Sequence, residues 1–172
     1  LTAFAKELDG IEQLEKWDGA YYSEKLKQKL FNLDDEKLKP YFQLEKVLEG
    51  AFTIAEKLYG LTFTEIFDID KYHDEVTTYK VKDKNNKLVA VFYADFFPRK
   101  GKRNGAWMTS FKPQYIKDGV NERPHISNVC NFTKPTETKP SLLTFNEVTT
   151  LFHEFGHGLH GMLANTTYPR LS

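Results

Sequence analysis

The sequence predicts an α+β protein, and three observations carry that prediction. Helix-type patterns dominate residues 1–60, strand-type patterns dominate residues 75–133, and a last helix-type pattern covers residues 145–164. Helices and strands that are segregated along the chain are typical of the α+β class. The chain has 172 residues, of which 40% are hydrophobic and 15% aromatic, so we expect one domain with a real core.

Two helices are predicted in the first sixty residues. The first follows Trp17-Asp18-Gly19 and covers residues 20–31. The second covers residues 41–59 and ends at Gly60, since glycine favours helix C-termini. Apolar residues recur along the second helix at helical spacing. They are Phe42, Leu44, Val47, Leu48, Phe52, Ile54, Ala55 and Leu58.

The middle of the chain reads as a small β-sheet. Residues 75–81 and 88–95 are rich in β-branched and aromatic residues and flank the turn-forming segment 83–87, which predicts a β-hairpin. Residues 106–111 and 126–132 are further strand candidates, and loops rich in glycine, proline and lysine separate them.

The last helix is predicted from its start signal. Thr144 and Glu147 have the spacing of a capping box, so the helix should begin near Phe145, and Asn165 and Pro169 should stop it. An advance of about 100° per residue separates two faces. The apolar face holds Phe145, Val148, Leu151, Phe152, Phe155, Leu159, Met162 and Leu163. The polar face holds Asn146, Thr150, His153, Glu154, His157, Gly158, His160 and Gly161.

Three glycines lie inside this helix, each costing about 1 kcal/mol relative to alanine. Close approach of a strand or of a substrate backbone would explain Gly158 and Gly161.

The polar face carries a His-Glu-x-x-His pattern, formed by His153, Glu154 and His157. Histidines four apart on a helix project from the same face, so both imidazoles can bind one metal ion. A zinc-bound water has a pKa near neutrality, and an adjacent carboxylate can take its proton as the water attacks a peptide carbonyl. The alternative is a chance match on a surface helix, which we expect in about one random chain of this length in a few hundred.

Residues 152–160 resemble the active-site helix of the thimet-oligopeptidase family of zinc metallopeptidases. The resemblance spans most of the chain, and the segment 167–172 looks most like the bacterial peptidyl-dipeptidase branch, also called dipeptidyl carboxypeptidases. The other matching segments are Trp17-Asp18 with Tyr21-Tyr22, residues 92–99, Gly101-Lys102 and residues 105–108.

The resemblance implies a zincin-like half-domain in which His153 and His157 bind one zinc ion and Glu154 is the general base. In the family, the third zinc ligand is a glutamate on a helix further along the chain. Residues 155–172 contain no aspartate or glutamate, so we expect a fragment that binds zinc weakly or not at all and is inactive alone. His160 lies about 10 Å along the helix from His153, so it is better interpreted as an outer hydrogen-bonding partner of the site, or as a residue of ordinary helix packing, than as a zinc ligand.

The implied activity of the longer protein is zinc-dependent hydrolysis of short peptides, with release of C-terminal dipeptides. The alternatives are an endo-oligopeptidase, an aminopeptidase, or a non-catalytic peptide-binding module. Family resemblance also makes Gly105, Ala106 and Trp107 the candidate sheet edge that pairs with an extended substrate. Trp107 as an ordinary core residue is the alternative.

Composition excludes several partners. The 24 basic and 24 acidic residues cancel, and no nucleic-acid-binding motif is present. The basic run 99–103 is interpreted as a solvated turn, in preference to a site for a substrate carboxylate. No apolar run is long enough to span a membrane. The expected partners are short peptides and the remainder of the same polypeptide.

The remaining titratable residues are expected to be structural. Cys130 is the only cysteine, which suits a reducing compartment and a buried structural thiol. We therefore expect a cytoplasmic location, with a periplasmic or exported protein as the alternative because the N-terminus reads as truncated. His73 and His125 are expected to be surface histidines in loops.

Overall fold

The computed structural model describes residues 1–31 and 35–172, and it has the predicted α+β composition. The chain forms two compact units, Leu1–Leu38 and Lys39–Ser172, and each is described by itself. Residues 32–34 of the predicted helical stretch 1–60 lie outside the described residues. Whether the chain acts as one partial catalytic domain of a larger enzyme stays a prediction.

The first unit consists of α1 (Thr2–Asp9), α2 (Asp18–Phe31) and α3 (Asp35–Leu38). The predicted helix 20–31 is therefore confirmed, with a start two residues earlier. Phe4, Ala5 and Tyr22 form its small buried cluster. The Tyr22 hydroxyl donates a hydrogen bond to Asp9 Oδ2 over 2.9 Å.

The second unit begins with a short 3₁₀ helix, Lys39–Tyr41, followed by α4 (Leu44–Tyr59). Gly60 ends α4 in the left-handed conformation, with φ 68°, as predicted. The predicted start at residue 41 was wrong, because Gln43 is extended and forms a β-bridge with Leu142. That pairing joins segments about a hundred positions apart, so local periodicity could not reveal it.

A five-stranded sheet forms the centre of this unit. Its strands are β1 (Thr62–Ile66), β2 (Thr77–Lys82), β3 (Leu88–Asp95), β4 (Trp107–Lys112) and β7 (His125–Val129), in the order β1-β2-β3-β7-β4. Only β3 and β7 pair in parallel. The predicted β2–β3 hairpin is confirmed. The predicted sheet boundary at residue 75 was wrong, because β1 precedes it.

A separate two-stranded hairpin, β5 (Tyr115–Lys117) and β6 (Val120–Glu122), was not predicted. Its turn residues Asp118 and Gly119 both have positive φ, 51° and 76°. An Asp-Gly pair is a standard signal for such a two-residue turn, so the sequence contained the information.

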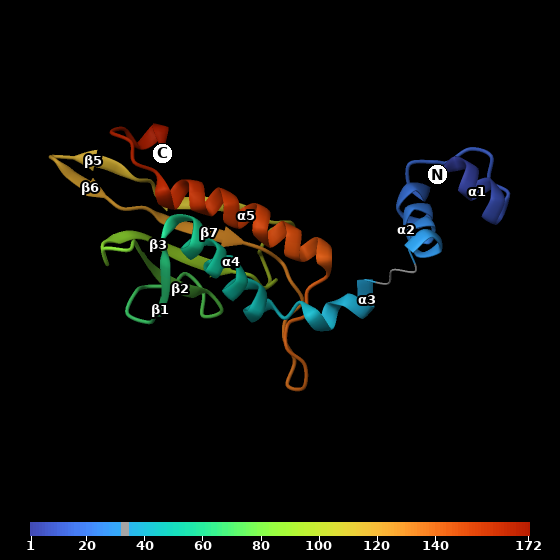
Figure 1. The fold of residues 1–172 in the computed structure, drawn as a ribbon, viewed down its shortest axis with the longest axis horizontal. Helices are drawn as coiled ribbons and strands as arrows, with labels where there is room; N and C mark the ends of the chain where they lie inside the picture. Colours follow the sequence, from blue (N-terminus) through green and yellow to red (C-terminus); the bar gives the residue numbers. More distant parts are fainter. Residues whose placement is uncertain (32–34) are drawn as a thin grey trace. The chain divides into compact units, whose positions relative to one another are not determined.

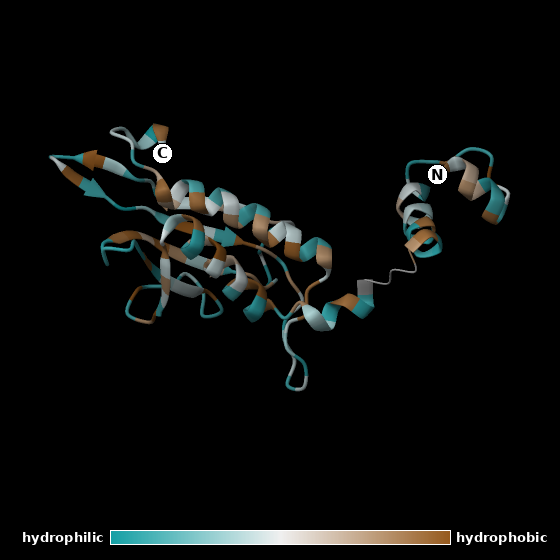
Figure 2. Cartoon of the chain, viewed as in Figure 1, coloured by the Kyte–Doolittle hydropathy of each residue, from teal (hydrophilic) through white to brown (hydrophobic). Residues whose placement is uncertain are grey.

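Helix α5 (Phe145–Leu163) lies beside α4 on one face of the sheet (Figure 1). The predicted capping box is present: Glu147 N–H donates to Thr144 Oγ1, and Thr144 N–H donates to a Glu147 carboxylate oxygen. The helix ends one residue before the predicted residue 164. Hydrophobic and hydrophilic residues alternate along it (Figure 2), as expected for a helix with one buried face.

The buried face of α5 is rotated from the predicted one. Phe145 and Phe152, predicted to be apolar contacts, are exposed at 55% and 36%. Glu154, Gly158 and Gly161, predicted on the polar face, are buried. The reason is close packing against β7. A Cβ atom on Gly158 would lie 2.6 Å from Asn128 Oδ1, and one on Gly161 would lie 2.8 Å from Ile126 Cδ1. The predicted close approach of a strand is therefore confirmed.

This packing predicts opposite effects for two alanine substitutions in one helix. Gly158→Ala is expected to destabilise the chain by about 1–3 kcal/mol, because the new methyl overlaps Asn128. Gly156→Ala is the matched control, since nothing lies within 4 Å of its Cβ position, and it should stabilise by up to about 1 kcal/mol. Urea denaturation of both variants measures the difference. Equal midpoints would contradict the close approach.

Candidate functional site

His153 and His157 lie one turn apart on α5, and both side chains are exposed. Their Nε2 atoms are 3.2 Å apart, and their ring planes are inclined at 84°. Zinc–imidazole bonds of about 2.0–2.1 Å at a tetrahedral angle require nitrogens about 3.3 Å apart. The two histidines therefore fit two adjacent corners of a tetrahedral zinc site.

Glu154, between the two histidines, turns toward the sheet. It is only 9% exposed. Together with His153 it lines an open hollow of about 420 Å³, which Ala106, Thr149 and Thr150 complete. Thr149 and Thr150 were not singled out as site residues, and only their place on the helix next to the motif could have indicated them. The arrangement brings a carboxylate and an imidazole to the same cavity, as general-base chemistry beside a histidine-bound metal would require.

No group of three His, Cys, Asp or Glu side chains within residues 1–31 and 35–172 is placed to share one metal ion. His160 is exposed and has no hydrogen bond to His153 or His157 in this part of the chain. It lines a different hollow, together with Met108 and Ser110. An outer hydrogen-bonding role for His160 thus stays a prediction.

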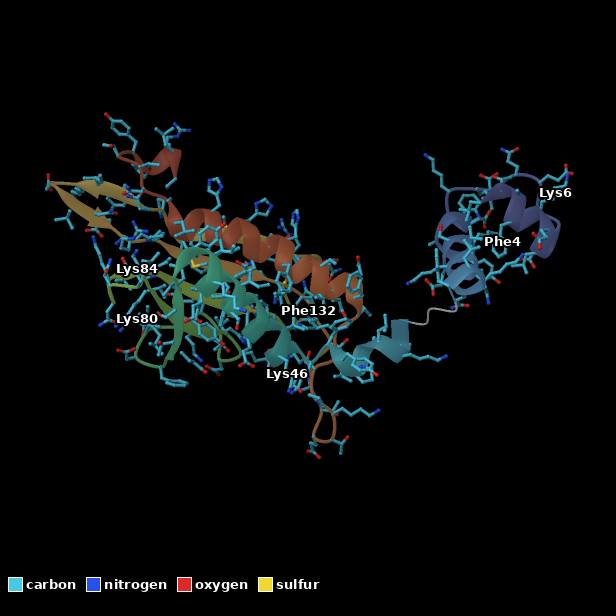
Figure 3. The ribbon with its side chains drawn as sticks, viewed as in Figure 1. Phe4, Lys6, Lys46, Lys80, Lys84 and Phe132 are labelled. Atoms are coloured by element: carbon cyan, nitrogen blue, oxygen red, sulfur yellow. The ribbon has the colours of Figure 1, made fainter. Side chains whose placement is uncertain are left out.

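Strand β4 ends the sheet, so its outer edge is unpaired in the described chain. The turn before it contains Gly105, whose φ of 93° favours glycine. Asn131 Nδ2 fixes this turn by donating to Gly105 O over 2.8 Å and to Arg103 O over 3.0 Å. No local sequence signal pointed to Asn131. Phe132, which follows it, lies beside the N-terminal half of α5 (Figure 3).

Of the three candidate substrate-binding residues, Gly105 and Ala106 line one hollow together, and Trp107 does not. Ala106 lines the hollow that contains His153 and Glu154. The Trp107 ring lies under the Arg103 guanidinium, 4.4 Å from ring centroid to Cζ, and alternation along a strand turns it to the face opposite Ala106. Substrate binding by these residues stays a prediction, and Ala106 is the best placed of them.

The basic run 99–103 is neither a simple solvated turn nor a free carboxylate site. Arg99 forms two hydrogen bonds with the buried Asp95, of 2.6 and 2.9 Å. The Lys102 ammonium, whose side chain is 3% exposed, bonds Asp95 Oδ1 and the carbonyls of Asp95, Phe97 and Cys130. Two of the four basic residues in this run are therefore structural: Arg99 and Lys102 both bind Asp95 at the end of β3, and Lys102 also binds the Cys130 carbonyl that follows β7.

The expectations for Cys130 and His125 have different outcomes. Cys130 is fully buried, and burial raises the pKa of its thiol to about 12, which agrees with a structural thiol. His125 is not a loop residue, which corrects the expectation: it begins β7, lies half-buried, and its Nδ1 is 3.1 Å from the Tyr93 hydroxyl. Burial lowers the pKa of His125. No described helix is long and apolar enough to cross a membrane.

Comparison with known proteins adds independent evidence. The family model "Peptidase family M3" matches residues 1–172. The chain is 48% identical over 164 residues to an oligopeptidase A of Salmonella typhimurium, covering 95% of this chain and 24% of the relative. It is 46% identical over 157 residues to a dipeptidyl carboxypeptidase of Escherichia coli, covering 91% and 23%. A thimet-like oligopeptidase of Dictyostelium discoideum is 40% identical over 159 residues, covering 91% and 24%. The chain thus spans about a quarter of the length of these relatives.

Proposed function

Because the chain belongs to peptidase family M3, we propose that the full-length protein containing it is a zinc-dependent peptidase that acts on short peptides. His153 and His157 are two of its zinc ligands, and Glu154 is its general base. The observation that carries this proposal is the 3.2 Å separation of the two Nε2 atoms, with Glu154 on the same hollow as His153.

When bound, zinc supplies a Lewis acid that polarises the peptide carbonyl and lowers the pKa of water at the site. His153 and His157 remain neutral to act as ligands. Glu154 accepts a proton from the attacking water and returns it to the leaving amine. The outer edge of β4 holds the substrate backbone by β-strand addition, which gives affinity with little dependence on side chains.

We further propose that the protein releases C-terminal dipeptides, because the segment 167–172 resembles that branch of the family. An endo-oligopeptidase is the alternative. The 48% identity to an oligopeptidase A supports this alternative about as strongly as the 46% identity to a dipeptidyl carboxypeptidase supports dipeptide release. Digestion of one defined decapeptide by the full-length protein separates them: successive dipeptides from the C-terminus support the first, and internal fragments support the second.

The 172-residue chain alone is expected to show no peptide hydrolysis in excess zinc above its Glu154→Gln variant. The reason is that a catalytic zinc site needs three protein ligands, and the described residues bring only two together. A fluorogenic peptide assay on both purified chains is the measurement. Robust turnover by the unsubstituted chain would contradict a third ligand supplied by the remainder of the protein.

A non-catalytic peptide-binding module is the remaining alternative. Zinc content of the full-length protein discriminates it from a peptidase, because loss of catalysis would leave no need for the metal. A cytoplasmic location is part of the proposal, on the ground that Cys130, the only cysteine of these 172 residues, is a fully buried thiol, which suits a reducing compartment.

A further inference from the structure

The edge strand β4 presents Met108 and Ser110 toward α5, and Ala106, the residue before the strand, lines a hollow with the same helix. Met108 and Ser110 pair with Asn128 and Ile126 on β7, and those two side chains lie directly under Gly158 and Gly161. Cross-strand partners share one face of a sheet. The Met108 methyl also lies 3.5 Å from the Cβ position of Gly161. Met108 and Ser110 therefore lie on the side of β4 that faces α5.

Two separate hollows open between α5 and this face. The first contains Ala106 with His153 and Glu154. The second, of about 100 Å³, contains Met108 and Ser110 with His160 and Gly161. Pro113, Gln114, Ile126 and Ser172 complete its lining. Since Ala106 faces the N-terminal half of α5 and Ser110 its C-terminal half, β4 and α5 run in the same direction.

The spacing of the hollows matches an extended peptide. Ala106 and Ser110 are four residues apart, about 13 Å along a strand. The residues that α5 contributes to the two hollows, 149–154 and 160–161, are also about 13 Å apart along the helix. A peptide added to the edge of β4 would thus place side chains four positions apart in the two hollows, with His153 lining the first hollow and His157 between the two along α5.

We propose that the second hollow is a substrate side-chain subsite on the N-terminal side of the cleaved bond; this rests on the proposed peptidase function. The direction follows from antiparallel addition to β4, the more stable pairing. In that orientation the N-terminal part of the substrate lies beside Ser110 and its C-terminal part lies beside Ala106. The residue in the subsite lies two or three positions before the bond, because residues 160–161 lie about 8 Å along α5 from the midpoint of His153 and His157 and a strand rises about 3.3 Å per residue.

The lining indicates which side chain fits. Met108 and Ile126 form an apolar floor. The Gln114 amide is occupied, since its Oε1 accepts from Thr166 N–H and its Nε2 donates to Thr166 O and Asn121. Ser172 Oγ donates to Pro169 O, and Ser110 and His160 are the lining side chains that have no hydrogen bond within the described chain. The subsite therefore takes one compact apolar side chain, such as that of leucine, and excludes large aromatic ones.

The test fills the subsite in the full-length protein. Ser110→Leu places apolar volume in the hollow, and Thr109→Leu makes the same chemical change on the opposite face of the same strand. Substrates are peptides that carry alanine or leucine at each position before the cleaved bond, with all products sized. Binding of the same peptides to the Glu154→Gln background provides a readout that does not need hydrolysis.

The expected result is selective. Unsubstituted protein should favour leucine over alanine by about 10-fold or more in kcat/KM at one position, two or three residues before the bond. Ser110→Leu should abolish that preference in both hydrolysis and binding, and Thr109→Leu should retain it. The subsite would be overturned if Ser110→Leu lowered kcat/KM equally for alanine and leucine peptides, or if it left the leucine preference unchanged. It would also be overturned if Thr109→Leu lost the preference as Ser110→Leu does. Selective binding without hydrolysis would support the subsite while contradicting the proposed peptidase.

Discussion

Glu154→Gln is expected to lower kcat of the full-length protein by about 10²–10⁴-fold, the usual contribution of a general base. Glutamine has nearly the same shape as glutamate but cannot accept the proton of the attacking water. The side chain is only 9% exposed and does not belong to the two-imidazole pair, so zinc and peptide binding should persist. Steady-state kinetics, together with the zinc content of the same sample, measures the effect.

Glu147→Gln on the same helix is the matched control. Glutamine at this position preserves the capping box with Thr144, so helix and activity should be retained. If Glu154→Gln keeps activity within about threefold of the unsubstituted protein, Glu154 is not the general base. If both variants lose activity equally, the loss reflects the helix rather than the chemistry.

The second large effect is expected at Asp95, far outside the His-Glu-x-x-His pattern. Asp95→Asn should destabilise the 172-residue chain by about 3–5 kcal/mol, because removing one partner of a buried ion pair leaves uncompensated charge. Here two cations, Arg99 and Lys102, would lose the same carboxylate. Urea denaturation followed by circular dichroism measures it. The exposed Asp68→Asn is the control, expected to change stability by less than about 0.5 kcal/mol.

The same cluster predicts an acid dependence. Burial raises the pKa of Asp95, but hydrogen bonds from Arg99, Lys102 and Tyr72 outweigh it and hold the pKa below the ordinary 3.8. A carboxylate with a depressed pKa stabilises the fold above its ordinary value, and the stabilisation is lost as the pH falls through its folded-state pKa. Asp95→Asn should therefore flatten the loss of stability in that acid range. If the free energy of unfolding falls with pH in the same way in Asp95→Asn and in the unsubstituted chain, the ion-pair account is contradicted.

Local signals predicted those elements that local interactions form. The capping residues Thr144 and Glu147 fixed the start of α5, and Gly60 fixed the end of α4. The start of α4 could not be predicted in this way, because Gln43 pairs with Leu142. β1 was missed for a related reason: five residues, Thr62–Ile66, become a strand by pairing with β2, and most of them are at least partly exposed.

The residues of the site also fall into two groups: those that local sequence patterns indicate, and those that depend on contacts between distant segments. His153, Glu154 and His157 could be proposed from the sequence because one helix holds all three at fixed spacing. The burial of Lys102 was not predicted, because a segment with four basic residues among five normally remains solvated, and the acceptors of Lys102 come from the ends of two strands. The second hollow depends on the register of β4 against β7 and on Gly161, which no helix periodicity could provide.

Zinc bound per polypeptide in the full-length protein tests the central claim most directly. Mass spectrometry of the metal should find one zinc ion in the unsubstituted protein and in Glu154→Gln, and much less in His157→Ala after the same dialysis. One zinc ion retained by His157→Ala, or by a variant lacking both His153 and His157, would contradict the assignment of these histidines as the metal ligands.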